Sequence, residues 1–559
     1  MKLKNVKSLL SILLAGAMMV GTMAGCGSNE TKKESSSAAS ESKTESSAAS
    51  KETTTEAVQE AEGVTYPIEG NVTLTLAMGQ EGPVNAAGAE NLFETPFGKA
   101  WQEQTGVTID VIQVADRDAM NLLLASGDLP DLIMFGVDSY SGGAVKAIKD
   151  KIIEPLNDYT EYLPDMMEVL NSNPDFMNSS KTDSGDIIGG QMIRGEEILK
   201  TSAGMMIRQD WLDDLNLEVP QTPDEVYEVL KAFKEEKGAE APLSMTGSWW
   251  LKSIMLGHGL ITSPFGLPKA DFYQVDGTVH YGFYEQEYKD VLTWLNKLYT
   301  DGLLDANFQT LDNATMNANI MNGVSGMTVG ATGGNMGTYL NTMKDTDPNY
   351  NLTGMAPLVA NKGDTPMSTH YSNAGVGYFI VMTPSCKDKV AAAKFINYGY
   401  TEEGSMLMNF GIEGESYTMV DGVPTYTDLI LNNPDGLTVQ QAMAQYLRAW
   451  NGCAMLQVGE YVRQYYALDQ QKEALATWSV SDAAKYQIPA IMIPDEYSAE
   501  LSTLTADVNV YIEEMLFKYI TGQKSLDTFE TEYLPTLKAM GVERIIEIEQ
   551  KGLDNYNAR

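Results

Sequence analysis

Alternation of apolar and polar residues marks the first regular element of the chain. Residues 72–76, Val-Thr-Leu-Thr-Leu, have the period of a β-strand with one covered face. The patterns that follow predict a helix over residues 97–104, a strand over 107–114 and a helix over 118–126. The apolar run 132–135 lies between turn residues and predicts a short third strand. The folded part therefore begins as strand, helix, strand, helix, strand.

This order of elements is typical of a parallel sheet with helices on both faces. In such sheets, ligands lie beyond the carboxyl ends of the strands. The loops that follow the first and third predicted strands begin at Gln80 and Asp138. We therefore expect a site near these two loops.

A second unit opens near residue 205. Residues 222–225, Thr-Pro-Asp-Glu, combine an N-cap, a first-turn proline and a capping-box glutamate, so they predict a helix start. Residues 285–299 predict another amphipathic helix, and 378–382 predict an apolar strand. From about residue 438 onward the pattern is largely helical.

The N-terminus has the pattern of a secretory signal. Three lysines occur among the first seven residues, residues 9–20 are apolar or small apart from one serine, and small residues precede Cys26. The apolar run is shorter than the roughly 20 residues of a membrane-spanning helix. The pattern resembles a lipobox, so we expect residues 1–25 to be removed and the Cys26 thiol to be acylated. A soluble secreted protein with a chance cysteine is the alternative.

Residues 26–63 follow as a tether rich in Ser, Ala, Thr, Glu and Lys, with no aromatic residue. Such a segment cannot bury enough apolar surface to fold, so we expect it to be disordered. Because one acyl chain binds membranes only marginally, stable retention calls for a lipid with several chains, palmitate among them. We expect the protein at the extracellular face of the cell membrane.

Composition limits the partners. The formal net charge is −38, and the tether contributes little of it because its eight acidic residues face four lysines. Such a chain is not expected to bind nucleic acid or to adhere to anionic lipid by charge. About 495 residues remain for the folded body 64–559, which is too many for one core and predicts two or more domains.

Cysteine and histidine are scarce. Beyond Cys26 the chain has only Cys386 and Cys453, which could form a single bridge but no disulfide framework. The histidines are His258, His280 and His370, and none lies in a recognisable zinc or Ser-His or Cys-His motif. We therefore predict no metal and no cofactor.

Five motifs carry a resemblance to a known family. In order they are residues 126–131 (Ser-Gly-Asp-Leu-Pro-Asp), 207–212 (Ile-Arg-Gln-Asp-Trp-Leu), 298–304 (Leu-Tyr-Thr-Asp-Gly-Leu-Leu), 400–404 (Tyr-Thr-Glu-Glu-Gly) and 409–415 (Asn-Phe-Gly-Ile-Glu-Gly-Glu). With the lipobox, the chain resembles the extracellular solute-binding lipoproteins of Gram-positive ABC importers, in the long sugar-type branch called family 1. It departs at residues 188–191, Ile-Gly-Gly-Gln, where relatives usually carry a short Gly-Leu-Pro-type segment.

The resemblance implies an α/β, two-lobed, periplasmic-binding-protein-like fold of type II. Its lobes are discontinuous, a hinge joins them, and the C-terminal part is helical. We expect lobe one to use about 64–170 and 325–400, and lobe two about 205–320 and 401–559. The implied partners are a small-molecule ligand, the transmembrane subunits of an ABC permease and the membrane through the lipid anchor, and we expect a monomer.

A sugar site needs aromatic faces for stacking and polar side chains for the hydroxyls. The adjacent Trp249 and Trp250, expected in a Gly/Ser loop after a short strand, are the leading candidates, although either could instead fill the core. Arg208 could bind the carboxylate of an acidic sugar, but we favour a role with Asp210 in holding the turn between strand and helix. The other candidate contacts, each of which could also be an ordinary surface or turn residue, are Gln80, Glu81, Asn85, Asp138, Tyr140, Asn335, Tyr371 and Asn373.

These observations favour a binding protein without catalysis that captures an extracellular solute, an oligosaccharide above all, for import. A tethered carbohydrate-active enzyme is the main rival, because hydrolysis needs only two well-placed carboxylates and the chain has 76 acidic residues. A binding protein for a peptide or another non-sugar ligand is the second alternative.

Overall fold

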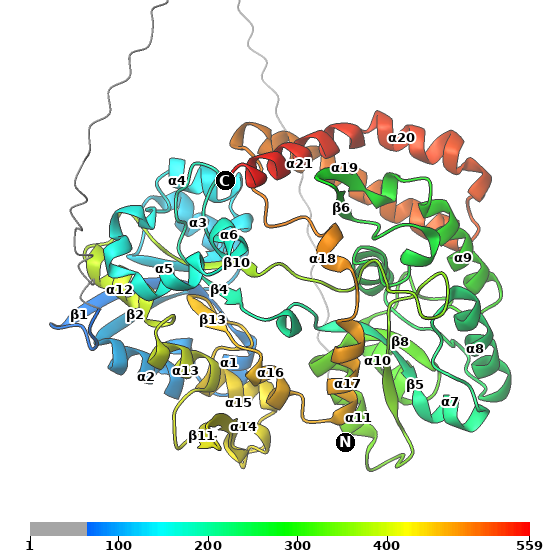
Figure 1. Ribbon diagram of the computed structural model, residues 1–559, viewed down its shortest axis with the longest axis horizontal. Helices are drawn as coiled ribbons and strands as arrows, with labels where there is room; N and C mark the ends of the chain where they lie inside the picture. Colours follow the sequence, from blue (N-terminus) through cyan, green and yellow to red (C-terminus); the bar gives the residue numbers. More distant parts are fainter. Residues whose placement is uncertain (1–63) are drawn as a thin grey trace, which may run out of the picture. The chain divides into compact units, whose positions relative to one another are not determined.

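The computed structural model describes residues 64–559. The predictions for the signal peptide, for Cys26 and for the tether lie outside the described residues. Helices and strands in the described part are organised around one six-stranded and one three-stranded sheet, with two separate hairpins (Figure 1).

The six-stranded sheet has the order β13-β4-β10-β3-β1-β2. Strands β2, β1 and β3 are parallel to one another, β10 is antiparallel to both β3 and β4, and β13 is parallel to β4. The bounds are β1 Val72–Gly79, β2 Val107–Val114, β3 Leu132–Gly136, β4 Gly190–Arg194, β10 Gly375–Met382 and β13 Met455–Gln457. The strands predicted at 72–76, 107–114, 132–135 and 378–382 are confirmed.

Side chains on both faces of this sheet are covered. Leu132 and Met134 belong to a core that also holds residues of α2, α5 and α12, whereas Ile133 and Phe135 join a core with residues of α3 and α4. Alternate residues of β3 thus face opposite helical layers, as a buried strand requires. The bounds are α2 Pro96–Thr105, α3 Arg117–Ser126, α4 Gly143–Lys149, α5 Pro164–Asn171, α6 Pro174–Ser180, α12 Lys389–Tyr398 and α13 Glu402–Phe410.

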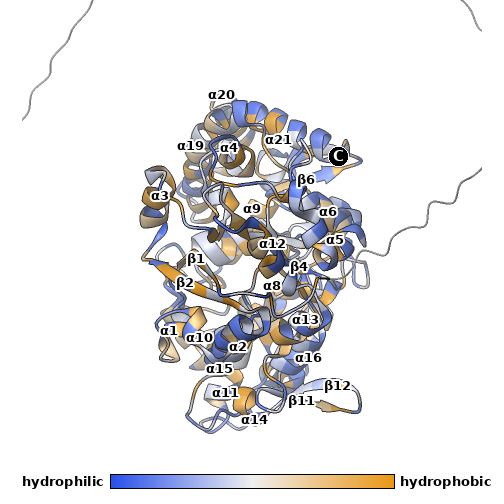
Figure 2. Ribbon diagram, turned by 90° about the vertical axis from the view of Figure 1, so that its left-hand side faces the viewer, coloured by the Kyte–Doolittle hydropathy of each residue, from blue (hydrophilic) through white to orange (hydrophobic). Residues whose placement is uncertain are grey.

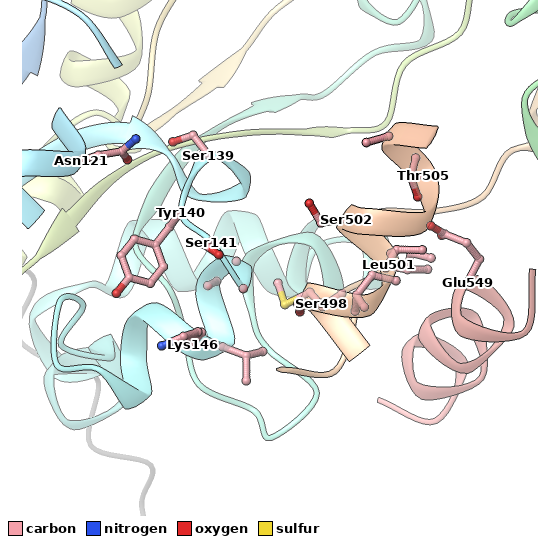
Figure 3. Close-up of a pocket in the computed structure, with 18 of the residues that line it drawn as sticks. Asn121, Ser139, Tyr140, Ser141, Lys146, Ser498, Leu501, Ser502, Thr505 and Glu549 are labelled. Carbon is pink, nitrogen blue, oxygen red and sulfur yellow. The ribbon is translucent and has the colours of Figure 1, made fainter. Parts of the chain in front are cut away.

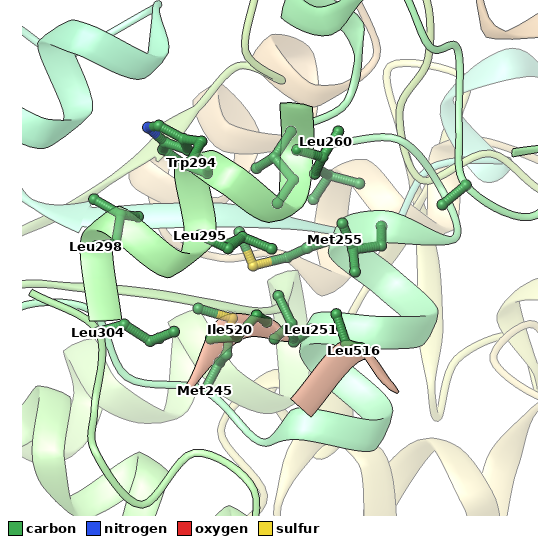
Figure 4. Close-up of a cluster of buried hydrophobic side chains, with 14 of the residues drawn as sticks. Met245, Leu251, Met255, Leu260, Trp294, Leu295, Leu298, Leu304, Leu516 and Ile520 are labelled. Atoms are coloured by element: carbon green, nitrogen blue, oxygen red, sulfur yellow. The ribbon is translucent and has the colours of Figure 1, made fainter. Parts of the chain in front are cut away.

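The three-stranded sheet has the order β8-β5-β9, and both pairings are antiparallel. Its strands are β5 Ala203–Arg208, β8 Met327–Ala331 and β9 Leu352–Met355. Around it lie α7 Gln209–Leu215, α8 Pro223–Glu236, the π-helix Gly247–Leu256, α9 Tyr288–Thr300, α10 Asn313–Met321 and α11 Thr338–Met343. Apart from α11, these elements share one hydrophobic core with helix α19, Asp495–Ile520. Figure 4 shows part of it, where Met245, Leu251 and Leu295 meet Leu516 and Ile520.

Helix α8 begins as the sequence predicts. The Thr222 hydroxyl accepts a hydrogen bond from the Glu225 backbone N–H at 3.3 Å, and the Glu225 carboxylate accepts one from the Thr222 backbone N–H at 3.3 Å. This reciprocal pair satisfies two amide groups that a helix start otherwise leaves without partners. The apolar face of the helix, with Val226, Leu230 and Phe233, is buried.

The C-terminal part is largely helical, as predicted, and it contacts both sheets. Its strand β13 joins the six-stranded sheet, whereas Trp478 at the end of α17 donates a hydrogen bond from Nε1 to the Met205 carbonyl of β5 at 3.0 Å. The bounds are α14 Asp428–Leu431, α15 Val439–Tyr446, α16 Glu460–Tyr465, α17 Asp469–Trp478, α18 Ala483–Tyr486, α19 Asp495–Ile520, α20 Leu534–Ala539 and α21 Val542–Asn557.

Helix α2 is amphipathic. Figure 2 colours strand β2 largely hydrophobic and helix α2 beside it largely hydrophilic, and α2 buries only Phe97, Gly98, Trp101 and Thr105. Within residues 64–559, no helix is both long enough and apolar enough to cross a membrane.

Candidate functional site

The carboxyl ends of β1 and β3 lie at one edge of the six-stranded sheet, because the two strands are parallel. Strand β10 runs the other way and therefore begins at this edge, where Tyr378 pairs with Gly136 at the end of β3. Strand β4 ends there with Arg194, since Gly375 of β10 pairs with Ile193. The loops that leave this edge surround a cavity.

This cavity, which we call the edge cavity, has a volume of about 400 Å³. Strands β4 and β10, the segment before β10, the turn after the π-helix and the segment before α19 line it. The lining residues are Val137, Ser179, Gln191, Arg194, His258, Tyr371, Ser372, Asn373, Gly375, Val376, Gly377, Phe379, Gln487, Ala490, Ile491 and Met492. None of them is acidic.

Arg194 brings a positive charge to the wall of the edge cavity. One guanidinium N–H, on Nη1, donates to the Asn373 carbonyl at 3.2 Å. Burial lowers the pKa of the guanidinium, and among the described residues no carboxylate pairs with it. A partly buried cation without a counter-ion is costly to maintain.

A hydrogen-bond chain leads from Arg194 to a second cation. The Gln487 amide donates from Nε2 to Asn373 Oδ1 at 3.2 Å, and its Oε1 accepts from Lys269 Nζ at 3.2 Å. Lys269 is buried, which lowers the pKa of its ammonium group, while Asp271 acts in the opposite direction. Asn373 and Gln487 thus fix the positions of both cations.

Two histidines lie beside this chain, with ring centroids 4.6 Å apart. Burial lowers the pKa of His258 to about 3, with His370 and Lys269 adding to the effect. Burial also lowers the pKa of His370 to about 4, with Arg194 adding to it. Both rings are therefore neutral near pH 7.

The motif at residues 188–191 contributes Gln191 to the lining of the edge cavity. A Cβ on Gly190 would lie 2.7 Å from side-chain atoms of both Ala454 and Ile396, so only glycine permits this packing. Gln191 is buried, and its Nε2 donates to the Ser179 carbonyl at 2.9 Å and to Ser180 Oγ at 2.8 Å. The departure from the family pattern thus brings an amide side chain to the edge cavity.

Two other cavities adjoin the edge cavity. The larger has a volume of about 890 Å³ and lies between the loop and helix after β3 and helix α19, with Glu549 of α21 at its wall (Figure 3). Ile491 and Met492 line both it and the edge cavity. The smaller, about 280 Å³, shares Tyr371, Asn373 and other residues with the edge cavity.

Glu549 is the carboxyl group of the larger cavity. Burial raises its pKa to about 7, and the nearby Asp271 charge acts in the same direction. Near neutral pH this carboxyl is therefore protonated in a substantial fraction of molecules, and it can then donate a hydrogen bond as well as accept one.

Comparison with known proteins assigns the chain to a family. The sequence profile of the bacterial extracellular solute-binding proteins matches residues 86–406, which is more than half of the chain. This chain belongs to that family.

Individual relatives and solved structures agree with this family assignment. This solute-binding protein is 29% identical over 369 residues to lipoprotein LipO of Bacillus subtilis, covering 63% of this chain and 70% of LipO. It is 24% identical over 543 residues to the fructooligosaccharide ABC transporter substrate-binding protein FusA of Streptococcus pneumoniae, covering 89% and 93%. Its fold is similar to that of the alginate-binding protein AlgQ2, with a TM-score of 0.68, 22% identity and coverage of 88% and 100%. The solute-binding protein therefore has the expected two-lobed α/β fold.

The structure brings three of the predicted site residues to the cavities. Tyr371 and Asn373 line the edge cavity, and Tyr140 lines the larger one. The Tyr371 hydroxyl donates to Glu197 at 2.9 Å. The Tyr140 hydroxyl donates to Asp150 at 2.8 Å, and burial and Asp150 raise its pKa to about 12.

Three predicted residues, Gln80, Glu81 and Asn85, follow β1 without lining any of the three cavities. Gln80 is exposed, and the side chain of Asn85 donates to the Ala89 and Glu90 carbonyls. Glu81 forms a two-pronged ion pair with Arg448, at 2.8 and 2.9 Å. Asp138 lies in the 3₁₀ turn Val137–Ser139. Their role in ligand binding stays a prediction.

The tryptophan pair lies on the π-helix Gly247–Leu256, not in the expected Gly/Ser loop, and the strand expected before it is reduced to isolated bridges at Leu243. Trp249 is 58% exposed, whereas Trp250 is buried and donates from Nε1 to Asn313 Oδ1 at 3.1 Å. Neither lines the three cavities.

Asn335 and Arg208 are held by neighbouring residues. Asn335 lies in a π-helical turn, Thr332–Gly337, instead of the expected loop, and its Oδ1 accepts from the Ala331 N–H at 2.9 Å. The buried Arg208 guanidinium donates to both oxygens of Asp210 and lies over the rings of Trp211 and Tyr350. Cys386 and Cys453 are both free and buried.

Sequence reasoning did not select Arg194, Lys269, His258 or Gln487. Arg194 ends an apolar strand and is followed by glycine, a pattern that many structural positions share. The strongest signal was the unusual segment 188–191, which ends three positions before Arg194.

Proposed function

We propose that this protein is the solute-capturing component of an ABC importer and that its solute is an oligosaccharide. The observation that carries the proposal is the set of three adjoining cavities at the carboxyl edge of the six-stranded sheet. Ligands of α/β proteins bind at this edge. The name of its relative FusA, a fructooligosaccharide ABC transporter substrate-binding protein, supports the solute class.

The lining suits a sugar chain longer than one residue. The edge cavity has a volume of about 400 Å³, and it shares lining residues with cavities of about 890 and 280 Å³. Tyr371 offers an aromatic ring, while Asn373, Gln487 and Ser372 offer amide and hydroxyl groups that can bond sugar hydroxyls. Successive sugar units can therefore occupy neighbouring cavities.

We assign the two lobes by sheet. The first lobe is built on the six-stranded sheet and includes β13, and the second is built on β8-β5-β9. Under this proposal β8 and β9, expected in lobe one, belong to lobe two, and β13, expected in lobe two, belongs to lobe one. The chain crosses between the sheets at residues 195–202, 356–374 and 458–468, which we propose as the hinge. Closure on the solute would then be a hinge motion driven by ligand contacts with both lobes.

The proposal is tested by thermal unfolding of the protein with a panel of oligosaccharides and, in parallel, peptides. Ligand at 100 times its Kd is expected to add about 2.7 kcal/mol to the free energy of unfolding and so to raise Tm. Analysis of the recovered sugar is expected to show no shortening. Stabilisation by peptides alone, or shortened sugar products, would contradict the proposal.

We further propose that a lipid on Cys26 holds the protein at the outer face of the membrane, with the segment to residue 63 as the tether. The sequence around Cys26 and the similarity to lipoprotein LipO support this proposal. Labelled fatty acid fed to producing cells is expected on the wild-type protein and absent from the Cys26→Ser variant. An unlabelled wild-type protein would refute the anchor.

A further inference from the structure

Among the residues whose side chains the structure describes, no carboxylate lines the edge cavity to balance the positive charge at its wall. Arg208, Lys269 and Arg448 are buried basic residues, and the buried side chain of Arg559 pairs with Asp183. Arg208 pairs with Asp210, and Arg448 pairs with Glu81. Lys269 has only the neutral Gln487 as its hydrogen-bond partner.

Arg194 is the cation that lies in the wall of the edge cavity itself. It lines the edge cavity together with residues that are all neutral or uncharged near pH 7. The chain has a net charge of −38, with twice as many acidic as basic residues, so neighbouring carboxylates are the expected surroundings of an arginine. A cation left without a carboxylate in such a chain needs another source of negative charge.

We propose that the edge cavity receives a carboxylate of the solute, so that the captured oligosaccharide contains uronic acid residues, with Arg194 as their direct partner. This inference rests on the proposed function and narrows its substrate class. A planar guanidinium matches a carboxylate with two parallel hydrogen bonds, and a counter-ion from the ligand offsets the cost of the buried charge.

The surroundings hold Arg194 ready for such a group. The Asn373 carbonyl takes one N–H of the guanidinium, and no other described residue accepts from the remaining N–H groups. Gln487 fixes the Asn373 side chain and in turn accepts from Lys269. Lys269 thus adds positive potential behind the cavity, while the neutral His258 places no competing cation on its wall.

Sulfate and phosphate esters share the anionic oxygens of a carboxylate. A carboxylate is planar and fits the guanidinium fork with both of its oxygens, and this geometry favours the uronate. Sulfated and phosphorylated sugars are therefore separate arms of the test.

The test measures binding by isothermal titration calorimetry for matched sugars. The acidic arm uses oligomers of galacturonate, glucuronate and mannuronate, and the matched neutral arm uses their methyl esters, which keep the sugar and remove the charge. Neutral galacto-oligosaccharides, a sulfated disaccharide and a sugar phosphate complete the set. We expect at least one uronate oligomer to bind about 30-fold more tightly than its ester, as for other buried charge pairs.

Variants assign the effect to Arg194. Arg194→Gln is expected to weaken uronate binding about 30-fold and to weaken binding of the ester much less, so that the difference between the two ligands is lost. Arg194→Lys is expected to retain an intermediate affinity, because it keeps the charge but loses the fork. Arg544→Gln is the matched control: Arg544 pairs with Glu500 and Glu547 and lines none of the three cavities, so wild-type binding is expected. Thermal unfolding of each unliganded variant confirms that it is folded.

The outcomes separate the two proposals. Neutral oligosaccharides that bind while no uronate does, or uronates and esters that bind equally, would overturn the inference and leave the proposed function standing. Tighter binding of sulfated or phosphorylated sugars would overturn the carboxylate assignment. If no oligosaccharide binds, the proposed function fails and this inference fails with it.

Discussion

Trp249 and Trp250 are adjacent in sequence, yet their side chains have different surroundings. Trp249 is 58% exposed, whereas Trp250 belongs to the core around the three-stranded sheet and donates to Asn313. The two rings are edge to face, with centroids 6.4 Å apart. The geometry of the π-helix therefore gives one indole to solvent and the other to the core.

This difference predicts unequal effects of substitution. Trp250→Ala is expected to lower the free energy of unfolding by about 3–5 kcal/mol, because it removes a large buried side chain. Trp249→Ala is expected to change it by no more than about 0.5 kcal/mol. Urea unfolding of both variants measures the difference, and equal losses would show that the described burial is wrong.

At the residue scale, the sequence indicated which side chains could contact a ligand, but not which other residues they contact in the fold. It singled out Tyr371 and Asn373, which line the edge cavity, but it could not reveal that Glu81 pairs with Arg448, 367 positions away. It also passed over Arg194, because an arginine at the end of a strand has no local feature that distinguishes a ligand contact from a structural cation. Such partners depend on the tertiary fold.

At the scale of elements, periodicity and capping were reliable guides. The strand predicted at 107–114 is β2 Val107–Val114, and the predicted capping box begins α8. These signals are local, since side-chain spacing and cap residues act within a few positions. The start of the π-helix Gly247–Leu256, residues 247–250, was expected as a loop, because the glycine and serine there are typical of turns.

The assignment of elements to sheets was beyond the sequence. Gly204 in β5 allows Trp478 to pack against the strand, and a Cβ there would lie 2.4 Å from the indole. This contact places α17 beside the three-stranded sheet, although β13, only a short distance earlier in the chain, belongs to the other sheet. Strand pairing and such close approaches arise between distant segments, so no local pattern indicates them.

At the scale of the molecule, the edge cavity and the smaller cavity beside it lie where the chain crosses between the two sheets. Tyr371 and Asn373 lie within the crossing segment 356–374, and Arg194 directly precedes another, 195–202. If these segments are the hinge, as we propose, a bound solute touches the residues that move on closure. Binding and closure would then be coupled through the same side chains.

The most direct test of this account is a crystal structure of the protein with the oligosaccharide that stabilises it most. We predict that the sugar occupies the edge cavity, extends into at least one adjoining cavity and touches Arg194, with residues of both lobes in contact with it. A sugar bound elsewhere on the surface, with the edge cavity empty, would contradict the account.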